Sequence, residues 1–348
     1  MQEMTNPYVV LDSVLCQSPH KDMNHEVAPV VFLVFNRPQH TARVFEAIRA
    51  ARPRYLLVVA DGPRPVRKED VELCRETRRI VSSPDWPCEL LTNFAEENMG
   101  CRSRVSSGLD WVFNQFPEAI ILEDDCLPVS SFFQFCTTLL DRYREDTRVM
   151  SIAGANFQLG NARGTASYYF SHYTHIWGWA TWRRAWSQTD HPLASWPEAR
   201  EEGWLSSVLD DPLEAEYWTE RFEKTYRGEI DTWDFAWLFN CWAQSGLTAV
   251  ANQNLVTNIG AGADATHTKN ESSMLGLPPQ DLGELVHPTK FIRDKAADRF
   301  IWEEHIRHYI PKKKRRPSLV RKVRNALQIR TRAQHLLQWQ KPKQLPNP

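Results

Sequence analysis

The sequence of 348 residues lacks any apolar run long enough to cross a membrane. A spanning helix needs about 18 or more predominantly apolar residues, and no window of this chain approaches that length without interruption. Residues 1–27 also lack the apolar centre of a secretory signal peptide, and we predict that they form a flexible leader. These absences lead us to expect a cytoplasmic protein without a membrane anchor.

Paired cysteines and internal repeats are missing as well. The 7 cysteines are odd in number and scattered, and no two of them have Cys-X-X-Cys spacing. This pattern argues against a disulfide framework or structural zinc and favours a reducing compartment. Because 42% of the residues are hydrophobic, the chain can bury a sizeable core in one large or two small domains.

Acidic residues are missing from residue 311 onward. The segment 311–348 contains 12 Lys and Arg, which leaves the remainder of the chain with a balance of −13. An acidic body of this kind is not a nucleic-acid-binding domain. Leu319, Val323 and Leu327 follow helical spacing, so we predict a basic, partly helical tail. It either makes a peripheral contact with the inner face of a membrane, at about 1 kcal/mol per cation, or stays solvated; both interpretations remain open.

Strand and helix patterns alternate over the first half of the chain. Apolar runs predict strands at 28–35, 54–60, 88–92, 118–122 and 149–153, and amphipathic segments predict helices at 42–50 (with Thr41 as N-cap), 69–81, 104–116 and 131–143. This alternation predicts an α/β fold of βαβ units with a mostly parallel sheet. After Gly154 the pattern changes to loops, aromatic residues and helices.

Three consecutive acids end the fourth predicted strand. Glu123, Asp124 and Asp125 directly follow an apolar run. The carboxyl ends of parallel strands form the crevice in which open α/β sheets bind ligands. Neighbouring carboxylates repel one another, and Mg²⁺ or Mn²⁺ would relieve this repulsion while also binding substrate phosphates. The alternative is a solvated loop after a strand.

The order of short motifs along the chain is more specific than any one of them. These motifs are Asn36-Arg37-Pro38, Asp61-Gly62, Glu123-Asp124-Asp125, Trp177-Gly178-Trp179 and Thr232-Trp233-Asp234. Over about residues 29–267 the order resembles GT-A fold glycosyltransferases, in particular the N-acetylglucosaminyltransferases that initiate complex N-glycans and bacterial nucleotide-diphospho-sugar transferases sharing their core. The resemblance implies a GT-A domain at 28–310, with a nucleotide-sugar-binding half at 28–154 and an acceptor-side half at 155–310.

The resemblance also implies roles for single residues near the donor. Asp125 would ligate the metal, Asp124 would contact the donor sugar or ribose, and Glu123 would lie close to the sugar. Arg37 follows the first strand, where a guanidinium can pair with a phosphate, although a surface ion pair is the alternative. Asp61 would accept the uracil N3–H, but Asp-Gly-Pro is also a strong turn sequence.

Asp234 is the candidate catalytic base. An inverting transfer needs a carboxylate that takes the proton of the acceptor hydroxyl. Trp233, Phe235 and Trp237 flank Asp234 and are expected to desolvate it partly, which suits a base working near neutral pH. Asp231 is the nearest rival. The alternative is that the aromatic residues form a core helix face and that Asp234 caps this helix.

Two further groups of residues have weaker signals. Trp179, with Trp177 and Trp182, would form the floor of a sugar pocket, because aromatic faces stack on sugars; aromatic residues at this spacing are also typical of a core. His267 is a candidate for a further metal ligand, against the alternative of an exposed or structural histidine.

The segment 98–102 precedes a predicted helix. Its backbone amides are placed to assist an anion, and Arg102 or Arg104 would add a second cation. Helix capping explains this segment almost as well.

The function that we expect is metal-dependent transfer of a sugar from a nucleotide-diphosphate sugar to a glycan or lipid-linked glycan. One alternative is a sugar-phosphate nucleotidyltransferase, although such enzymes usually carry a glycine-rich basic loop after the first strand, where this chain has Asn36-Arg37-Pro38-Gln39. The other is a non-catalytic carbohydrate-binding module.

Overall fold

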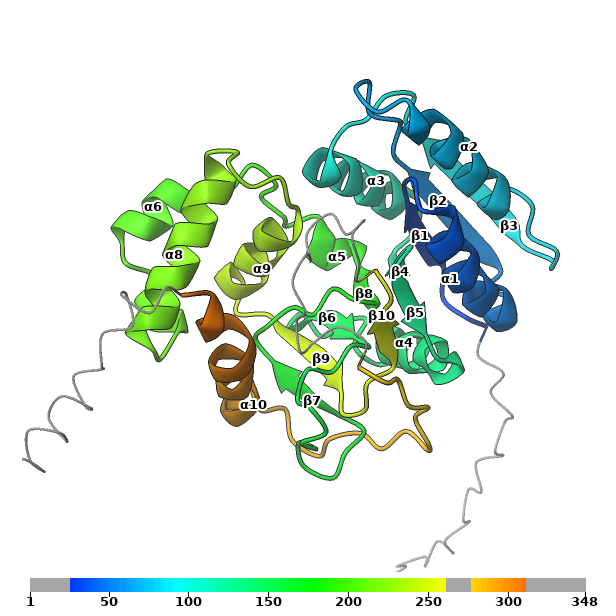
Figure 1. Cartoon of the computed structure of the whole chain (residues 1–348). Coiled ribbons are helices and arrows are strands. Elements are labelled where there is room, and N and C mark those ends of the chain that lie inside the picture. The colour runs from blue at the N-terminus through cyan, green and yellow to red at the C-terminus, as the bar shows by residue number, and fades with distance from the viewer. Residues whose placement is uncertain (1–25, 261–276, 311–348) are drawn as a thin grey trace, which may run out of the picture.

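The computed structural model describes residues 26–260 and 277–310. Within them, an eight-stranded sheet forms the centre of the fold (Figure 1). Its strands are β1 (Val30–Val34), β2 (Tyr55–Ala60), β3 (Glu89–Phe94), β4 (Glu118–Glu123), β6 (Val149–Ala153), β7 (Tyr168–Ser171), β8 (Trp179–Trp182) and β9 (Leu247–Ala251). A second, two-stranded sheet pairs β5 (Cys126–Pro128) with β10 (Val256–Asn258).

The strand order is β3-β2-β1-β4-β8-β6-β9-β7. Strands β8 and β7 run against the other strands of this sheet, which are parallel to one another. The predicted α/β class with a mostly parallel sheet is therefore confirmed. The helices are α1 (Pro38–Ala51), α2 (Glu69–Val81), α3 (Cys101–Gln115), α4 (Ser130–Arg142), α5 (Arg183–Trp186), α6 (Trp196–Glu201), α7 (Leu205–Val208), α8 (Pro212–Tyr226), α9 (Asp234–Ala243) and α10 (Lys295–Ile301), followed by a π-helical turn (Trp302–Ile306) and a 3₁₀ turn (Arg307–Tyr309).

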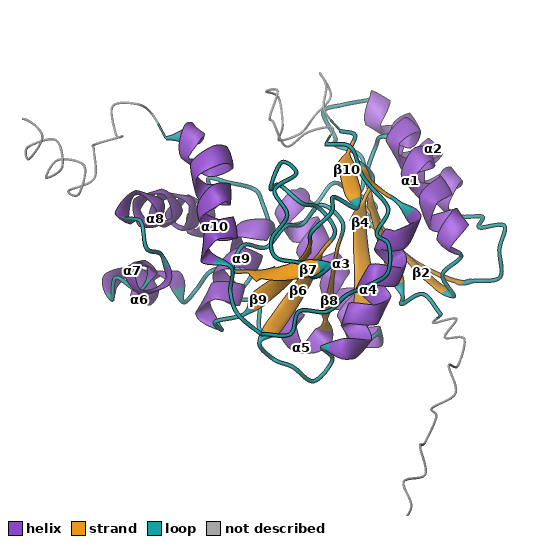
Figure 2. Cartoon of the chain, turned by 90° about the horizontal axis from the view of Figure 1, so that it is seen from below, coloured by secondary structure: helices purple, strands orange, loops and turns teal. Residues whose placement is uncertain are grey.

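Helices cover both faces of the sheet, with the strands lying between them in Figure 2. Every residue of β1 is buried. Val30, Phe32 and Val34 share a core with side chains of α1, α2 and α4, whereas Val31 and Leu33 share one with α3, α5 and α9. Successive side chains of a strand point to opposite faces, so a strand covered on both sides is apolar throughout.

Helix α1 begins earlier than the sequence predicted. Its first residue is Pro38 and its N-cap is Arg37, while Thr41, the predicted cap, is buried inside the helix. A proline suits the first helical position because its missing N–H has no partner there anyway. Helix α2, by contrast, has the predicted bounds.

The expectation of only loops and helices after Gly154 was wrong. Strands β7, β8 and β9 extend the same sheet, and β8 lies between β4 and β6, with Ala180 opposite both Ile120 and Ile152. Its four residues are all buried. A short run without alternation of apolar and polar residues carries no strand signal, which is why the sequence did not predict it.

Helix α9 lies between the sheet and the helices α6, α7 and α8, which stand on the side away from α1 and α2 (Figure 1). Trp237 and Cys241 pack toward the sheet, and Phe239 and Trp242 pack toward the outer helices. A helix that is apolar all round is a buried helix. Packing on two sides thus fixes Asp234, the first residue of α9.

None of the helices in the described ranges is both long and apolar enough to span a bilayer. His267, most of the predicted leader and the basic tail 311–348 lie outside these ranges.

Candidate active site

The three acids stand at the carboxyl edge of the parallel strands. Residue Glu123 at the end of β4 lies opposite Leu33 of β1, and Val34 lies opposite Ala60 of β2. Arg37 and Asp61 follow these neighbouring strands. The register therefore brings residues distant in sequence to one edge of the sheet, where ligands bind in open α/β folds.

Arg37 is bonded to two of the acids. Its Nη1 donates to Asp125 Oδ2 at 3.0 Å, and its Nη2 donates to Asp124 Oδ1. Burial would lower the pKa of the Arg37 guanidinium, but the charges of Asp124 and Asp125 outweigh burial and raise it above its ordinary value. The guanidinium is thus a firmly charged partner of the carboxylates.

Asp124 and Asp125 each have one carboxylate oxygen that is not bonded to Arg37. Asp124 Oδ2 is buried and has no hydrogen-bond partner among the described residues, and Asp125 Oδ1 accepts only the Cys126 thiol, at 3.5 Å. A buried acceptor without a partner costs about 1–3 kcal/mol, more when charged, so a missing ligand is expected there. Such a pair of carboxylates fits a hard divalent cation.

Protein side chains alone do not complete a metal site in the described part of the chain. No group of three or more His, Cys, Asp and Glu side chains there is arranged to hold an ion. Mg²⁺ and Mn²⁺ sites built on one or two carboxylates obtain further oxygens from substrate phosphates. The acids at the end of β4 fit that kind of site.

The carboxylates make the site strongly electronegative. Burial, together with the charges of Asp125 and Asp124, raises the pKa of Glu123 to about 8. Burial also raises the pKa of Asp124 to about 6, against the opposing charge of Arg37. Glu123 therefore carries a proton over part of the neutral pH range until a cation enters.

The end of β10 closes over the acids. The Ile259 amide donates to the Asp125 carbonyl at 2.8 Å, and His40 Nε2 lies 3.1 Å from the Ile259 carbonyl. A Cβ on Gly260 would lie 2.4 Å from Asp125 Oδ2. A larger residue at this position would therefore push the Asp125 side chain aside, a feature that the sequence did not predict.

Asp61 is engaged by its own loops. Its Oδ1 accepts the amides of Gly62 at 2.8 Å and Met99 at 2.9 Å, and its Oδ2 accepts Asn98 Nδ2 at 2.9 Å. The residue is 7% exposed, and burial raises its pKa. Asp61 thus joins the loop after β2 to the loop before α3, and little of its carboxylate faces outward.

The amides at the start of α3 are used by Asp231. Its two carboxylate oxygens accept the Cys101 and Arg102 amides, each at 3.0 Å. The Arg102 and Arg104 side chains bond to backbone carbonyls: Arg102 Nη1 donates to Thr225 O at 2.8 Å and Arg104 Nε to Ala60 O at 3.1 Å. The capping interpretation therefore describes this segment, and these groups serve the fold.

Asp234 begins α9 and accepts a hydrogen bond from the Thr232 hydroxyl. Its charge is close enough to Glu123 to raise the pKa of that carboxyl. After burial, the charges of Glu123, Asp234, Asp231 and Asp61 all raise the pKa of the Cys101 thiol. Acids from three separate segments therefore lie close to Cys101.

Trp179 belongs to the core and does not line a surface. Its exposure is 0%, and its ring stacks on Trp233 with centroids 5.4 Å apart. Trp182 is also buried, so neither ring is available as the floor of a pocket. Trp177 keeps part of its surface, and Gly178, with φ +68°, bends the chain before β8 begins.

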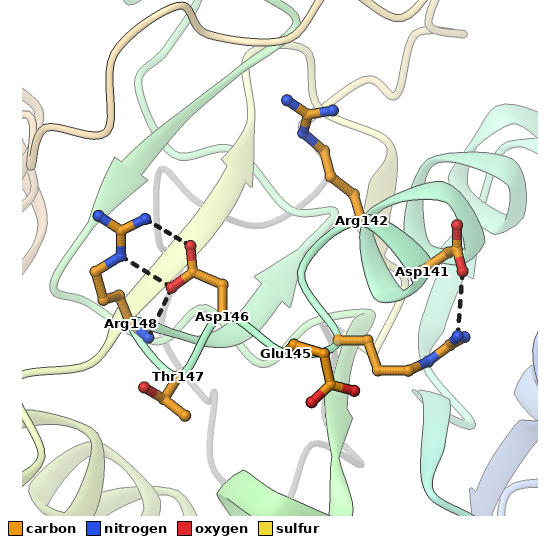
Figure 3. A pocket seen from close by; sticks show the side chains of 7 residues that line it. Asp141, Arg142, Glu145, Asp146, Thr147 and Arg148 are labelled. Carbon is orange, nitrogen blue, oxygen red and sulfur yellow. Dashed lines mark hydrogen bonds and ion pairs between the residues drawn. The ribbon is translucent and has the colours of Figure 1, made fainter.

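A shallow depression of about 700 Å³ lies at the other end of the sheet (Figure 3). It is lined by Asp141 and Arg142 at the end of α4 and by residues 144–148, which precede β6. Its charges pair with one another, as Arg148 with Asp146 at 2.7 Å and Arg144 with Asp141 at 3.2 Å. Since β6 and β4 run in the same direction, this depression is remote from the acids and is not part of the candidate site.

Comparisons with known proteins identify no family. No family model matches the chain, and no curated protein matches it either. One similar solved structure is 4-diphosphocytidyl-2C-methyl-D-erythritol synthase from Anaerococcus prevotii, at 8% identity and TM-score 0.32, covering 64% of this chain and 88% of that one. Another is a mannosyltransferase from Pyrobaculum calidifontis in complex with GDP-Man and Mn²⁺, at 12% identity and TM-score 0.30, covering 45% of each chain. We draw no conclusion about this chain from similarities with such low scores. The structure itself shows an α/β protein with acids gathered at one edge of its sheet.

Proposed function

We propose that this protein is a metal-dependent glycosyltransferase. It transfers a sugar from a uridine-diphosphate-linked donor, such as UDP-N-acetylglucosamine, to a hydroxyl of a glycan or lipid-linked glycan, with inversion. The observation that carries the proposal is the meeting of Arg37, Glu123, Asp124 and Asp125 with Asp234 at the carboxyl edge of the sheet.

In the proposed reaction, Asp124 and Asp125 act on the side of the leaving diphosphate, and Asp234 acts on the acceptor hydroxyl. Asp125 and Asp124 would hold a Mn²⁺ or Mg²⁺ ion. When bound, the ion supplies Lewis-acid stabilisation of the departing diphosphate. Asp234 accepts the proton of the acceptor hydroxyl. Its place on the doubly packed helix α9 keeps its carboxylate in a fixed position, as general-base catalysis requires.

A donor screen tests this proposal. The protein is incubated with Mn²⁺ and a panel of nucleotide sugars, and thermal shifts are recorded with each. Donors that stabilise the fold are then assayed for release of the nucleoside diphosphate in the presence of glycan acceptors. Failure of every nucleotide sugar to shift the melting temperature in Mn²⁺ would contradict the proposal.

The reaction products separate this proposal from its alternatives. A sugar-phosphate nucleotidyltransferase releases pyrophosphate, whereas a glycosyltransferase releases UDP. Helix α1 begins at Pro38, directly after Arg37, so the loop after β1 has no glycine-rich phosphate-binding turn. A carbohydrate-binding module would bind the glycan without Mn²⁺-dependent affinity for UDP.

The basic tail suits an acceptor that is anchored in a membrane. Its 12 cations, without a single acid, favour contact with anionic headgroups. Sedimentation with anionic vesicles, comparing the full chain with one lacking residues 311–348, tests this part of the proposal. Equal sedimentation of the two proteins would remove the membrane contact.

A further inference from the structure

Arg37 sits between the two carboxylates that a metal ion would bridge. One guanidinium nitrogen is bonded to Asp125 at 3.0 Å and the other is bonded to Asp124. The side chains are 20% exposed for Arg37, 15% for Asp125 and 3% for Asp124. Because water is largely excluded, the attraction is stronger than in a surface ion pair. Arg37 is therefore the resident counter-ion of these acids.

One guanidinium does not balance the site. Asp124 and Asp125 share one guanidinium, that of Arg37, and Asp124 Oδ2 still lacks a partner among the described residues. The site thus keeps an attraction for a further cation, although its central position is already filled.

Space beside Arg37 is closed by the backbone of Gly260. A Cβ there would lie 3.0 Å from Arg37 Nη1 and 2.4 Å from Asp125 Oδ2. The Gly260 amide is itself held by Asn258 Oδ1 at 2.8 Å. The other oxygen of Asp124, Oδ2, is enclosed, so the oxygen that faces the site is Oδ1, which Arg37 already holds. A cation that engages Asp124 and Asp125 together would therefore have to move the guanidinium.

We propose that Arg37 makes metal binding conditional on the nucleoside diphosphate, an inference that rests on the proposed function. A divalent cation alone must displace the guanidinium into a partly desolvated space without an anionic partner. A diphosphate offers the displaced guanidinium a forked, charge-assisted contact and gives the metal the oxygens that the protein lacks. Metal and diphosphate then bind with positive coupling, and by thermodynamic linkage each increases the affinity for the other by the same factor.

The coupling is measurable without turnover. Free Mn²⁺ is titrated by electron paramagnetic resonance against the full chain, with and without saturating UDP. For the wild type we expect UDP to tighten Mn²⁺ binding on the order of 10-fold. For Arg37→Gln we expect Mn²⁺ alone to bind on the order of 10-fold more tightly than to the wild type, with the effect of UDP reduced to about twofold or less.

Arg49→Gln is the matched control. Arg49 lies on the same helix, α1, and its Nε donates to Asp85 at 2.8 Å on the surface. The substitution removes a guanidinium of α1 without touching the acids, so both Mn²⁺ titrations should match the wild type. Arg37→Lys keeps the charge but not the fork, and its coupling should fall between those of the wild type and Arg37→Gln.

The outcomes separate this inference from the proposed function. If UDP tightens Mn²⁺ binding equally in the wild type and in Arg37→Gln, the role of Arg37 is overturned and the glycosyltransferase proposal stands. If the wild type binds no Mn²⁺ even with saturating UDP, both are overturned. Should Arg37→Gln fail to fold, as judged by circular dichroism, Arg37→Lys decides by the same comparison.

Discussion

The Asp231 carboxylate accepts the Cys101 amide at 3.0 Å across 130 residues of sequence. This contact joins the segment before α9 to the first turn of α3. It gives the two neighbouring acids of the Asp231–Asp234 segment different surroundings, because Asp231 faces helix amides and Asp234 lies near Glu123. The two acids can therefore be told apart by substitution.

Asp231→Ala should lower stability. Loss of a carboxylate that caps a helix costs about 0.5–2 kcal/mol, and the Cys101 and Arg102 amides would lose their partner. Urea unfolding followed by circular dichroism measures the change in the free energy of unfolding. An unchanged midpoint would contradict the capping role.

Asp234→Asn should lower kcat by roughly 10²–10⁴-fold, the usual contribution of a general base. The amide keeps the size of the side chain and can still accept from the Thr232 hydroxyl. Turnover is measured with donor and acceptor both saturating, and the melting temperature is recorded as the control. Near-normal kcat would remove Asp234 from the chemistry.

Asp125→Ala should abolish Mn²⁺-dependent turnover, a loss of roughly 100-fold or more, while unfolding stays cooperative. Arg37 retains Asp124 as its partner, so no buried guanidinium is left without a carboxylate. Asp141→Ala is the control, since its side chain is 62% exposed at the other end of the sheet. Full activity of Asp125→Ala in Mn²⁺ would show that the metal is held elsewhere.

Trp179→Ala should act on stability. Truncating a fully buried aromatic side chain costs about 3–5 kcal/mol, and Trp179 packs on Trp186, Trp233 and Trp237. Trp177→Ala, at a partly exposed ring, should cost less stability. The free energies of unfolding of the two variants test this order, and a stable Trp179→Ala with a raised donor KM would instead place the ring in the pocket.

Deprotonation of Glu123 should lower the stability of the ligand-free protein as the pH rises. Its pKa is raised from 4.5 to about 8 in the folded state, so the folded protein binds the proton more tightly than the unfolded chain does. This contribution to stability is complete below the unfolded pKa and is lost as the pH rises through the folded one, between about pH 5 and 8.

Comparison with Glu123→Gln isolates this contribution, because other buried groups, such as Glu214 with a pKa raised by burial to about 7, titrate in the same range. The melting temperature is recorded from pH 5 to 9 for both proteins. We expect the variant to have the shallower decline, and parallel curves would contradict the shift at Glu123.

The sequence predicted the first half of the sheet because each βαβ unit carries its own local signals. The predicted helix at residues 69–81 and strand at 149–153 have the observed bounds. For Arg37, which follows the first strand, the sequence led us to expect a phosphate contact or a surface ion pair, and it did not predict that the guanidinium bonds to the acids after β4. That contact depends on side-chain direction, which residue order does not encode.

Features that depend on long-range packing were not predictable. Trp177 and Trp179 are two residues apart, yet one is partly exposed and the other is enclosed, and a bend at Gly178, where φ is +68°, lies between them. The contact of Asp231 with α3 and the closure of Gly260 over Asp125 also join distant segments. From the sequence alone, Asp231, which accepts the amides at the start of α3, could not be distinguished from Asp234 as the candidate base.

The position of β8 has a consequence for biosynthesis. This strand joins β4 to β6 but is translated after both. In a nascent chain that ends near residue 154, the edges of β4 and β6 that pair with β8 have no hydrogen-bonding partner. Unpaired strand edges are prone to pair with other chains. We expect a fragment of residues 28–154 to aggregate when expressed alone, and the ribosome-bound chain to depend on chaperones most until Trp182 has emerged.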